Sequence, residues 1–113
     1  MNIEEIREYC LSKAGADESF PFDDKTLVFK VGGKMFALLS LDTAREINLK
    51  CDPERAVELR ALHPFITPGY HMNKKHWNTV DYIKSPDDLT RELVDHSYEL
   101  VVNKLPQKIR KSL

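Results

Sequence analysis

The sequence predicts an α+β domain in which helices pack on a mostly antiparallel sheet. Two strand-like runs, 26–31 and 34–41, flank Gly32-Gly33, and two glycines between such runs are typical of a β-hairpin. The segment 86–104 carries apolar residues at helical spacing, over a face wide enough to cover a sheet. Both faces of the hairpin are largely apolar, so we expect helix on one face and other cover on the second.

The composition is that of one ordinary globular domain. The chain has 113 residues, of which 42% are hydrophobic and 31% charged, and we treat 1–113 as a single domain. The formal net charge of −1 excludes a protein that is basic throughout. The charge is segregated, because residues 1–24 carry seven acids and two bases whereas 103–113 carry four bases and no acid. Folding can therefore gather basic segments into one patch.

The N-terminal third is predicted to begin with a helix. Asn2 can cap it, and the apolar spacing continues to about Lys13. The aromatic segment 19–22 is predicted as an edge strand, a position that tolerates Pro21.

In the hairpin, a loop of two residues would place Phe29 opposite Phe36 and Leu27 opposite Leu38. The segment 46–50 alternates polar and apolar residues and is predicted as a half-buried strand.

The second half is predicted to contain two helices and two strands. Asp52 and Pro53 are typical of a helix start, and Ser85-Pro86 repeats that pattern before the long helix. The full predicted order is α-β-β-β-β-α-β-β-α. Its last four elements are a helix 53–62, strands 65–67 and 77–83, and the helix 86–104. A frayed basic tail, 107–113, is expected to follow.

A basic and aromatic stretch, 68–80, is the main functional candidate. It combines ammonium, imidazole, amide and indole groups, which are the groups that contact phosphates and bases. The candidate residues for nucleic-acid or anion binding are Lys50, His71, Asn73, Lys74, Lys75, His76 and Trp77. The alternative interpretation is a solvated loop in which Trp77 packs in the core and the lysines are ordinary surface charges.

Other chemistry has little support in the sequence. The four histidines lack the spacing of metal ligands, and no glycine-rich phosphate loop or serine-nucleophile motif occurs. Cys10 and Cys51 are too few for a disulfide framework, and we expect both to be reduced.

We expect no catalytic residue, metal or cofactor. With no apolar signal segment or membrane-length run, we expect a cytoplasmic monomer that does not bind membranes.

Several motifs together resemble the MmcQ/YjbR family. They are Phe20-Pro-Phe22, 26–30 with 32–36, 47–53, 68–79, and the last helix with His96-Ser-Tyr98 and Lys104-Leu-Pro106. The resemblance covers nearly the whole chain. It implies a small bacterial α+β domain of frataxin-like or secretion-chaperone-like fold, whose members are commonly described as DNA-binding through a double-wing arrangement.

The leading hypothesis is therefore a non-catalytic nucleic-acid-binding module that uses a wing at 70–80 to contact double-stranded DNA weakly and with strong salt dependence. A protein-interaction or chaperone-like module is the alternative. A small-anion binder or enzyme that uses His71 or His76 is the third.

Overall fold

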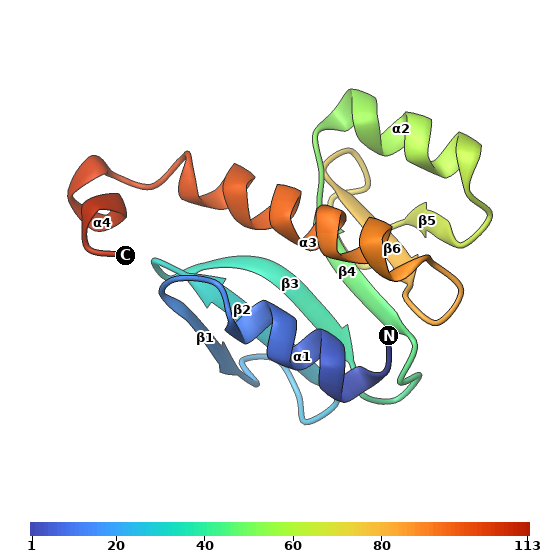
Figure 1. Ribbon diagram of the computed structural model, residues 1–113, viewed down its shortest axis with the longest axis horizontal. Helices are drawn as coiled ribbons and strands as arrows, with labels where there is room; N and C mark the ends of the chain where they lie inside the picture. Colours follow the sequence, from blue (N-terminus) through green and yellow to red (C-terminus); the bar gives the residue numbers. More distant parts are fainter.

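Six strands form one antiparallel sheet with helices packed on it, in the order α-β-β-β-β-α-β-β-α-α (Figure 1). The computed structural model describes residues 1–113 and confirms the predicted α+β class. The elements are α1 (Ile3–Leu11), β1 (Ala16–Ser19), β2 (Thr26–Val31), β3 (Lys34–Ser40), β4 (Glu46–Lys50), α2 (Pro53–Leu62), β5 (Ile66–Pro68), β6 (Trp77–Asp81), α3 (Asp87–Val102) and α4 (Gln107–Lys111).

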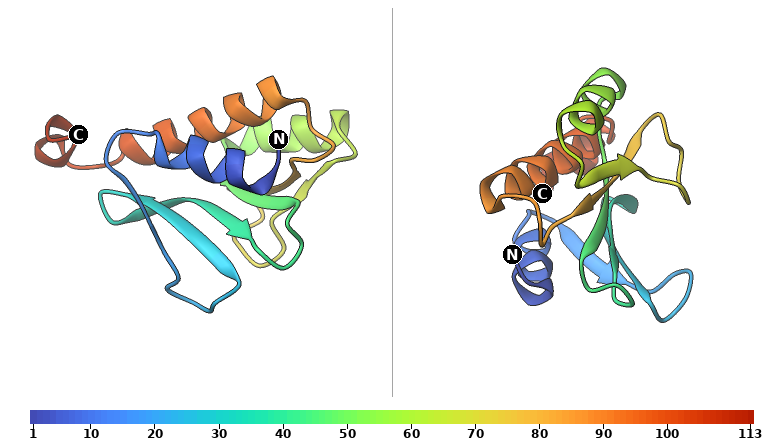
Figure 2. Two further views of the ribbon diagram at one scale, coloured as in Figure 1. Left: turned by 60° about the horizontal axis from the view of Figure 1, so that its bottom comes forward. Right: turned by 90° about the vertical axis from the view of Figure 1, so that its right-hand side faces the viewer.

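The sheet order is β1-β2-β3-β4-β6-β5, and every neighbouring pair is antiparallel. Helix α3 lies over β3 and β4, α1 lies beside β1, and α2 contacts β5. Figure 2 shows these three helices on one side of the sheet, so the opposite face, which we call the open face, carries no helix. No helix has the length and apolar character needed to cross a membrane.

Helix caps explain where two of the helices begin. The side chain of Asn2 accepts a hydrogen bond from the N–H of Glu5, and the Glu5 carboxylate accepts from the N–H of Asn2, which forms a capping box. Asp52 caps α2 by accepting from the N–H of Arg55, with Pro53 at the first helical position. Both caps were predicted. Ser85 is different, because α3 has no side-chain cap and the Ser85 hydroxyl accepts from Thr90 instead.

The β2–β3 hairpin has the predicted loop but a different register. Gly32 and Gly33 both have positive φ, +57° and +78°, as the two central residues of a type I′ hairpin turn require. Beyond the turn, Lys30 pairs with Met35 but Phe29 pairs with Ala37, so Phe36 is an extra residue of β3. This β-bulge shifts all later pairs by one residue. The predicted pairs of Phe29 with Phe36 and of Leu27 with Leu38 are therefore wrong.

Two strand boundaries also differ from the prediction. The edge strand is Ala16–Ser19 and not 19–22, because Pro21 has no N–H to donate and Phe20 and Phe22 are exposed. Strand β6 ends at Asp81, whose carboxylate accepts from the N–H groups of Ile83 and Lys84 and turns the chain.

The basic tail, predicted as a frayed end, is helical over Gln107–Lys111. It forms α4, and a Cβ atom built on Gly32 would lie 2.7 Å from Leu105 and 3.2 Å from Ile109. The tip of the hairpin is therefore packed against the corner between α3 and α4.

The core contains one hydroxyl without a partner. Tyr82 is fully buried, its hydroxyl has no hydrogen-bond partner in the protein, and burial raises its pKa to about 12. We predict that Tyr82→Phe raises the free energy of unfolding by about 1 kcal/mol, because it removes a buried unsatisfied polar group. Urea denaturation measures this.

Tyr98→Phe is the matched control, since the Tyr98 hydroxyl donates to the carbonyl of Ala14 at 2.5 Å. It should lower the free energy of unfolding by about 1 kcal/mol. Equal losses in the two variants would contradict the prediction.

Candidate functional site

Strands β3 and β4 separate at one end of the sheet, where the hydroxyl of Ser97 lies between them. Ala37 and Leu49 form the last pair of the ladder. Beyond it, the N–H of Lys50 donates to Ser97 Oγ at 2.9 Å, and that hydroxyl donates to the carbonyl of Phe36 at 2.5 Å. Ser97 is fully buried on α3. A helix side chain thus replaces the next interstrand bond, and the strands diverge (Figure 1).

A cavity of about 330 Å³ opens at this end, and we call it the lysine cavity. Its lining comes from the starts of β3 and β6, the end of β4 and the C-terminal end of α3 with the residues after it. The lining residues are Lys34, Met35, Lys50, Trp77, Val101, Lys104 and Leu105. Three of the seven are lysines and none is acidic. Such a set can accept an anion against an apolar wall.

The three lysines of the cavity have no counter-charge in the fold. None of Lys34, Lys50 and Lys104 is part of a salt bridge in the chain. Partial burial, together with the positive charges of Lys104 and Lys34, lowers the pKa of the Lys50 amine. The fold therefore places positive charges together without neutralising them.

The predicted basic loop lies beside this cavity. The carbonyl of His76 accepts from the N–H of Cys51 at 2.8 Å, which holds the loop next to the end of β4. Arg60 supports the loop from α2 by donating to the carbonyl of Lys74 at 3.1 Å and to Asn78 Oδ1 at 2.9 Å. Lys74 and Lys75 are exposed on it.

Two side chains of the loop already have structural partners. Asn73 Oδ1 accepts from the N–H of Lys75 at 3.0 Å, which forms a local turn. The amine of Lys74 lies 5.1 Å from the centre of the Tyr70 ring, and that ring is 65% exposed.

Trp77 packs on the open face of the sheet. It is 7% exposed and forms a small cluster with Val28 and Leu38, against which Met35 and Met72 pack. Its indole is not available for stacking on bases. This arrangement is the packing role weighed as the alternative, and Trp77 also lines the lysine cavity.

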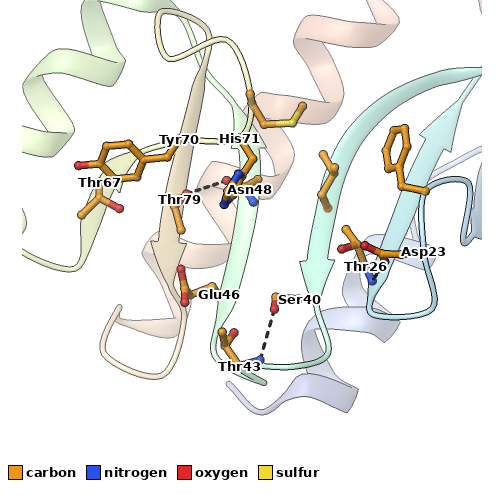
Figure 3. Close-up of a pocket in the computed structure, with 13 residues that line it drawn as sticks. Asp23, Thr26, Ser40, Thr43, Glu46, Asn48, Thr67, Tyr70, His71 and Thr79 are labelled. Carbon is orange, nitrogen blue, oxygen red and sulfur yellow. Dashed lines mark hydrogen bonds between the residues drawn. The ribbon is translucent and has the colours of Figure 1, made fainter.

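A second and larger cavity, of about 700 Å³, lies on the open face (Figure 3). We call it the open-face groove. Its floor carries hydroxyl and amide groups, including Thr79, which donates to Asn48 Oδ1 at 2.6 Å. Two carboxylates, those of Asp23 and Glu46, line it, and the N–H of Lys25 helps to hold the pKa of Asp23 below its usual value. This groove therefore disfavours phosphate.

The histidines do not come together. His71 lines the open-face groove, whereas His96 lies at α3 and accepts from the N–H of Asp52. Burial is the main cause that lowers the pKa of His96. No group of three His, Cys, Asp or Glu side chains is placed to hold a metal ion.

Neither thiol is activated. Cys10 and Cys51 are free, as predicted, and both are buried. Burial raises the pKa of Cys51, and it raises that of Cys10 to about 12.

Comparison with known proteins identifies the family. A family model described as YjbR matches residues 11–100. The chain belongs to the YjbR family.

The uncharacterized protein YjbR of Escherichia coli K12 is 40% identical over 115 residues, which cover 100% of this chain and 98% of that protein. The uncharacterized protein YbdF of Escherichia coli O157:H7 is 43% identical over 94 residues, 81% of this chain and 77% of that one. A crystal structure of Deinococcus radiodurans DR2400, of domain family DUF419, superposes with a TM-score of 0.91 at 44% identity, covering 98% of this chain and 86% of that one. The YjbR fold observed here is thus shared, and none of these names assigns an activity.

Sequence reasoning missed two residues of the lysine cavity. Lys50 and Trp77 were candidates and do line the lysine cavity, but Lys34 and Lys104 were not proposed. Lys34 directly follows the Gly32-Gly33 turn, and Lys104 lies shortly before Pro106, which ends the long helix. The three lysines are far apart in the sequence, and the sheet topology places Lys34 and Lys104 near Lys50.

The role of Ser97 can be tested by removing its hydroxyl. We predict that Ser97→Ala lowers the free energy of unfolding by about 2 to 4 kcal/mol, because the Lys50 N–H and the Phe36 carbonyl both lose their partner inside the protein. The exposed Ser112 is the control, and its change to alanine should alter stability by less than about 0.5 kcal/mol. Chemical denaturation of both variants decides, and a loss at Ser97 no larger than the control would refute the bridge.

Proposed function

We propose that this protein binds double-stranded DNA without catalysing a reaction on it, through backbone phosphates at the end of the sheet that carries the lysine cavity. The observation that carries the proposal is the convergence of Lys34, Lys50 and Lys104, which have no ion pair in the fold. A phosphate would neutralise their mutual repulsion. The exposed Lys74 and Lys75 extend the same surface.

Phosphates, not bases, are the contacts that this surface supports. Trp77 is packed and offers no face to a base. The short α4 adds three more basic residues, Lys108, Arg110 and Lys111. Contacts of this kind position a protein on DNA without selecting a sequence. The net charge of −1 favours weak binding.

Salt dependence tests the proposal. The log of the association constant for a fluorescent duplex should fall linearly with the log of salt concentration, and each lost phosphate contact should reduce that slope by about 0.9. We expect Lys34→Ala with Lys104→Ala to reduce the slope by about 1.8, and Lys74→Ala with Lys75→Ala to reduce it by up to the same amount. Affinity should weaken equally on unrelated sequences.

The control is Lys25→Ala with Lys84→Ala. These two lysines are exposed, lie at the opposite end of the strands, and change the net charge by the same amount. Their removal should leave the slope unchanged. Equal slopes for all variants, or no binding at low salt, would remove DNA as the ligand.

A protein partner is the second candidate, and the open-face groove favours it. Phe22 and Tyr70 line this groove and are 63% and 65% exposed. If they dock a partner, Phe22→Ser with Tyr70→Ser should abolish capture of that partner from a lysate of the source organism while the fold is retained. The control is Leu62→Ser, since Leu62 is 72% exposed on α2. Identical capture by the two variants would exclude the groove as the docking site.

A further inference from the structure

The amine of Lys50 lies in an unusual environment for a surface lysine. Its main chain is fixed on both sides, because its N–H bonds Ser97 and the residue pairs with Trp77 of β6. Its side chain enters a cavity of about 330 Å³, a volume that suits a small molecule. Apolar side chains form the rest of the wall, from Met35, Trp77, Val101 and Leu105.

Two effects favour the uncharged form of this amine. Desolvation by the surrounding side chains lowers its pKa, and the positive charges of Lys104 and Lys34 lower it further. An uncharged amine is a nucleophile. A lysine that is desolvated and placed beside another cation is the arrangement by which proteins activate an amine toward carbonyl compounds.

The two neighbouring lysines differ from Lys50 in position. Lys34 and Lys104 are exposed at the rim, at the start of β3 and just beyond the end of α3. Their exposed amines can contact an anionic group, while the side chain of Lys50 is partly buried. The cavity thus combines one candidate nucleophile with two candidate anion-binding groups.

We propose that Lys50 forms a reversible imine with small anions that carry an aldehyde or ketone, while Lys34 and Lys104 hold the anionic group. The nitrogen of the uncharged amine bonds to the carbonyl carbon, and the carbonyl oxygen leaves as water. Overall, the ammonium form of Lys50 and the carbonyl compound give a protonated imine and one water molecule, with no oxidation or reduction. This covalent chemistry goes beyond phosphate contact with DNA and does not depend on it.

The imine can be trapped by borohydride reduction, which converts it to a stable secondary amine. The protein is incubated without DNA with pyridoxal 5′-phosphate, reduced, digested and mapped by mass spectrometry. Lys84, exposed and far from the cavity, is the internal control. We expect Lys50 to be modified at least about fivefold faster than Lys84, because a lowered pKa increases the fraction of uncharged amine.

Two comparisons test the anion contact. Pyridoxal without phosphate should modify Lys50 about five to ten times more slowly, since it forms no charge pair with the rim lysines. Lys104→Ala should slow modification by pyridoxal 5′-phosphate to a similar extent, and the control Lys84→Ala should not. Glyoxylate, whose anionic group is a carboxylate, separates the classes of ligand. If both glyoxylate and pyridoxal 5′-phosphate modify Lys50, the cavity accepts anionic carbonyl compounds in general. If only pyridoxal 5′-phosphate does, the cavity selects a phosphate.

Modification spread evenly over Lys50 and Lys84 would overturn the proposal, as would equal rates with and without the phosphate. Neither result bears on the salt dependence of DNA binding, which is measured with other variants and no carbonyl reagent.

Discussion

A single buried hydroxyl, that of Ser97, joins helix α3 to the sheet at the point where two strands part. It accepts from β4 and donates to β3, and so occupies the place of a ladder bond. The bulge at Phe36 turns that carbonyl out of the β2–β3 register and leaves it for the helix. If β3 and β4 instead paired to their ends, the space between Lys34 and Lys50 would close. The bulge, the position of α3 and the lysine cavity are therefore one arrangement.

Much of the fold is encoded locally and can be predicted. The Gly32-Gly33 turn, the Asp52 cap and the apolar face of α3 depend on neighbours within a few residues, which is what a sequence displays. The bulge is different. Val28, Phe29, Ala37 and Leu38 are all apolar, so a shift of one residue still buries an apolar side chain on each face. The contact of the Phe36 carbonyl with Ser97, 61 residues away, is formed in the observed register, and a sequence does not display a contact over that separation.

The candidate site likewise contains residues that the sequence predicts and residues that only the fold brings together. Lys50 and Trp77 stand out because they belong to dense local motifs, but the packed position of Trp77 depends on Val28 and Leu38 across the sheet. Lys34 and Lys104 look like ordinary surface lysines in the sequence. Their importance comes from the antiparallel order, which returns the start of β3, the end of β4 and the end of α3 to one place.

The contact of Gly32 with Leu105 and Ile109 has a consequence for dynamics. The tip of a hairpin is ordinarily among the first places where a sheet opens, because few side chains cover it. Here the absent side chain of Gly32 admits the methyl groups of Leu105, and the tip is clamped beneath the corner between α3 and α4. Lys34 lies two residues after Gly32 and Lys104 directly precedes Leu105, so the same contact holds both rim lysines close to the packed tip. Any anion that draws them inward would also slow amide hydrogen exchange at the turn.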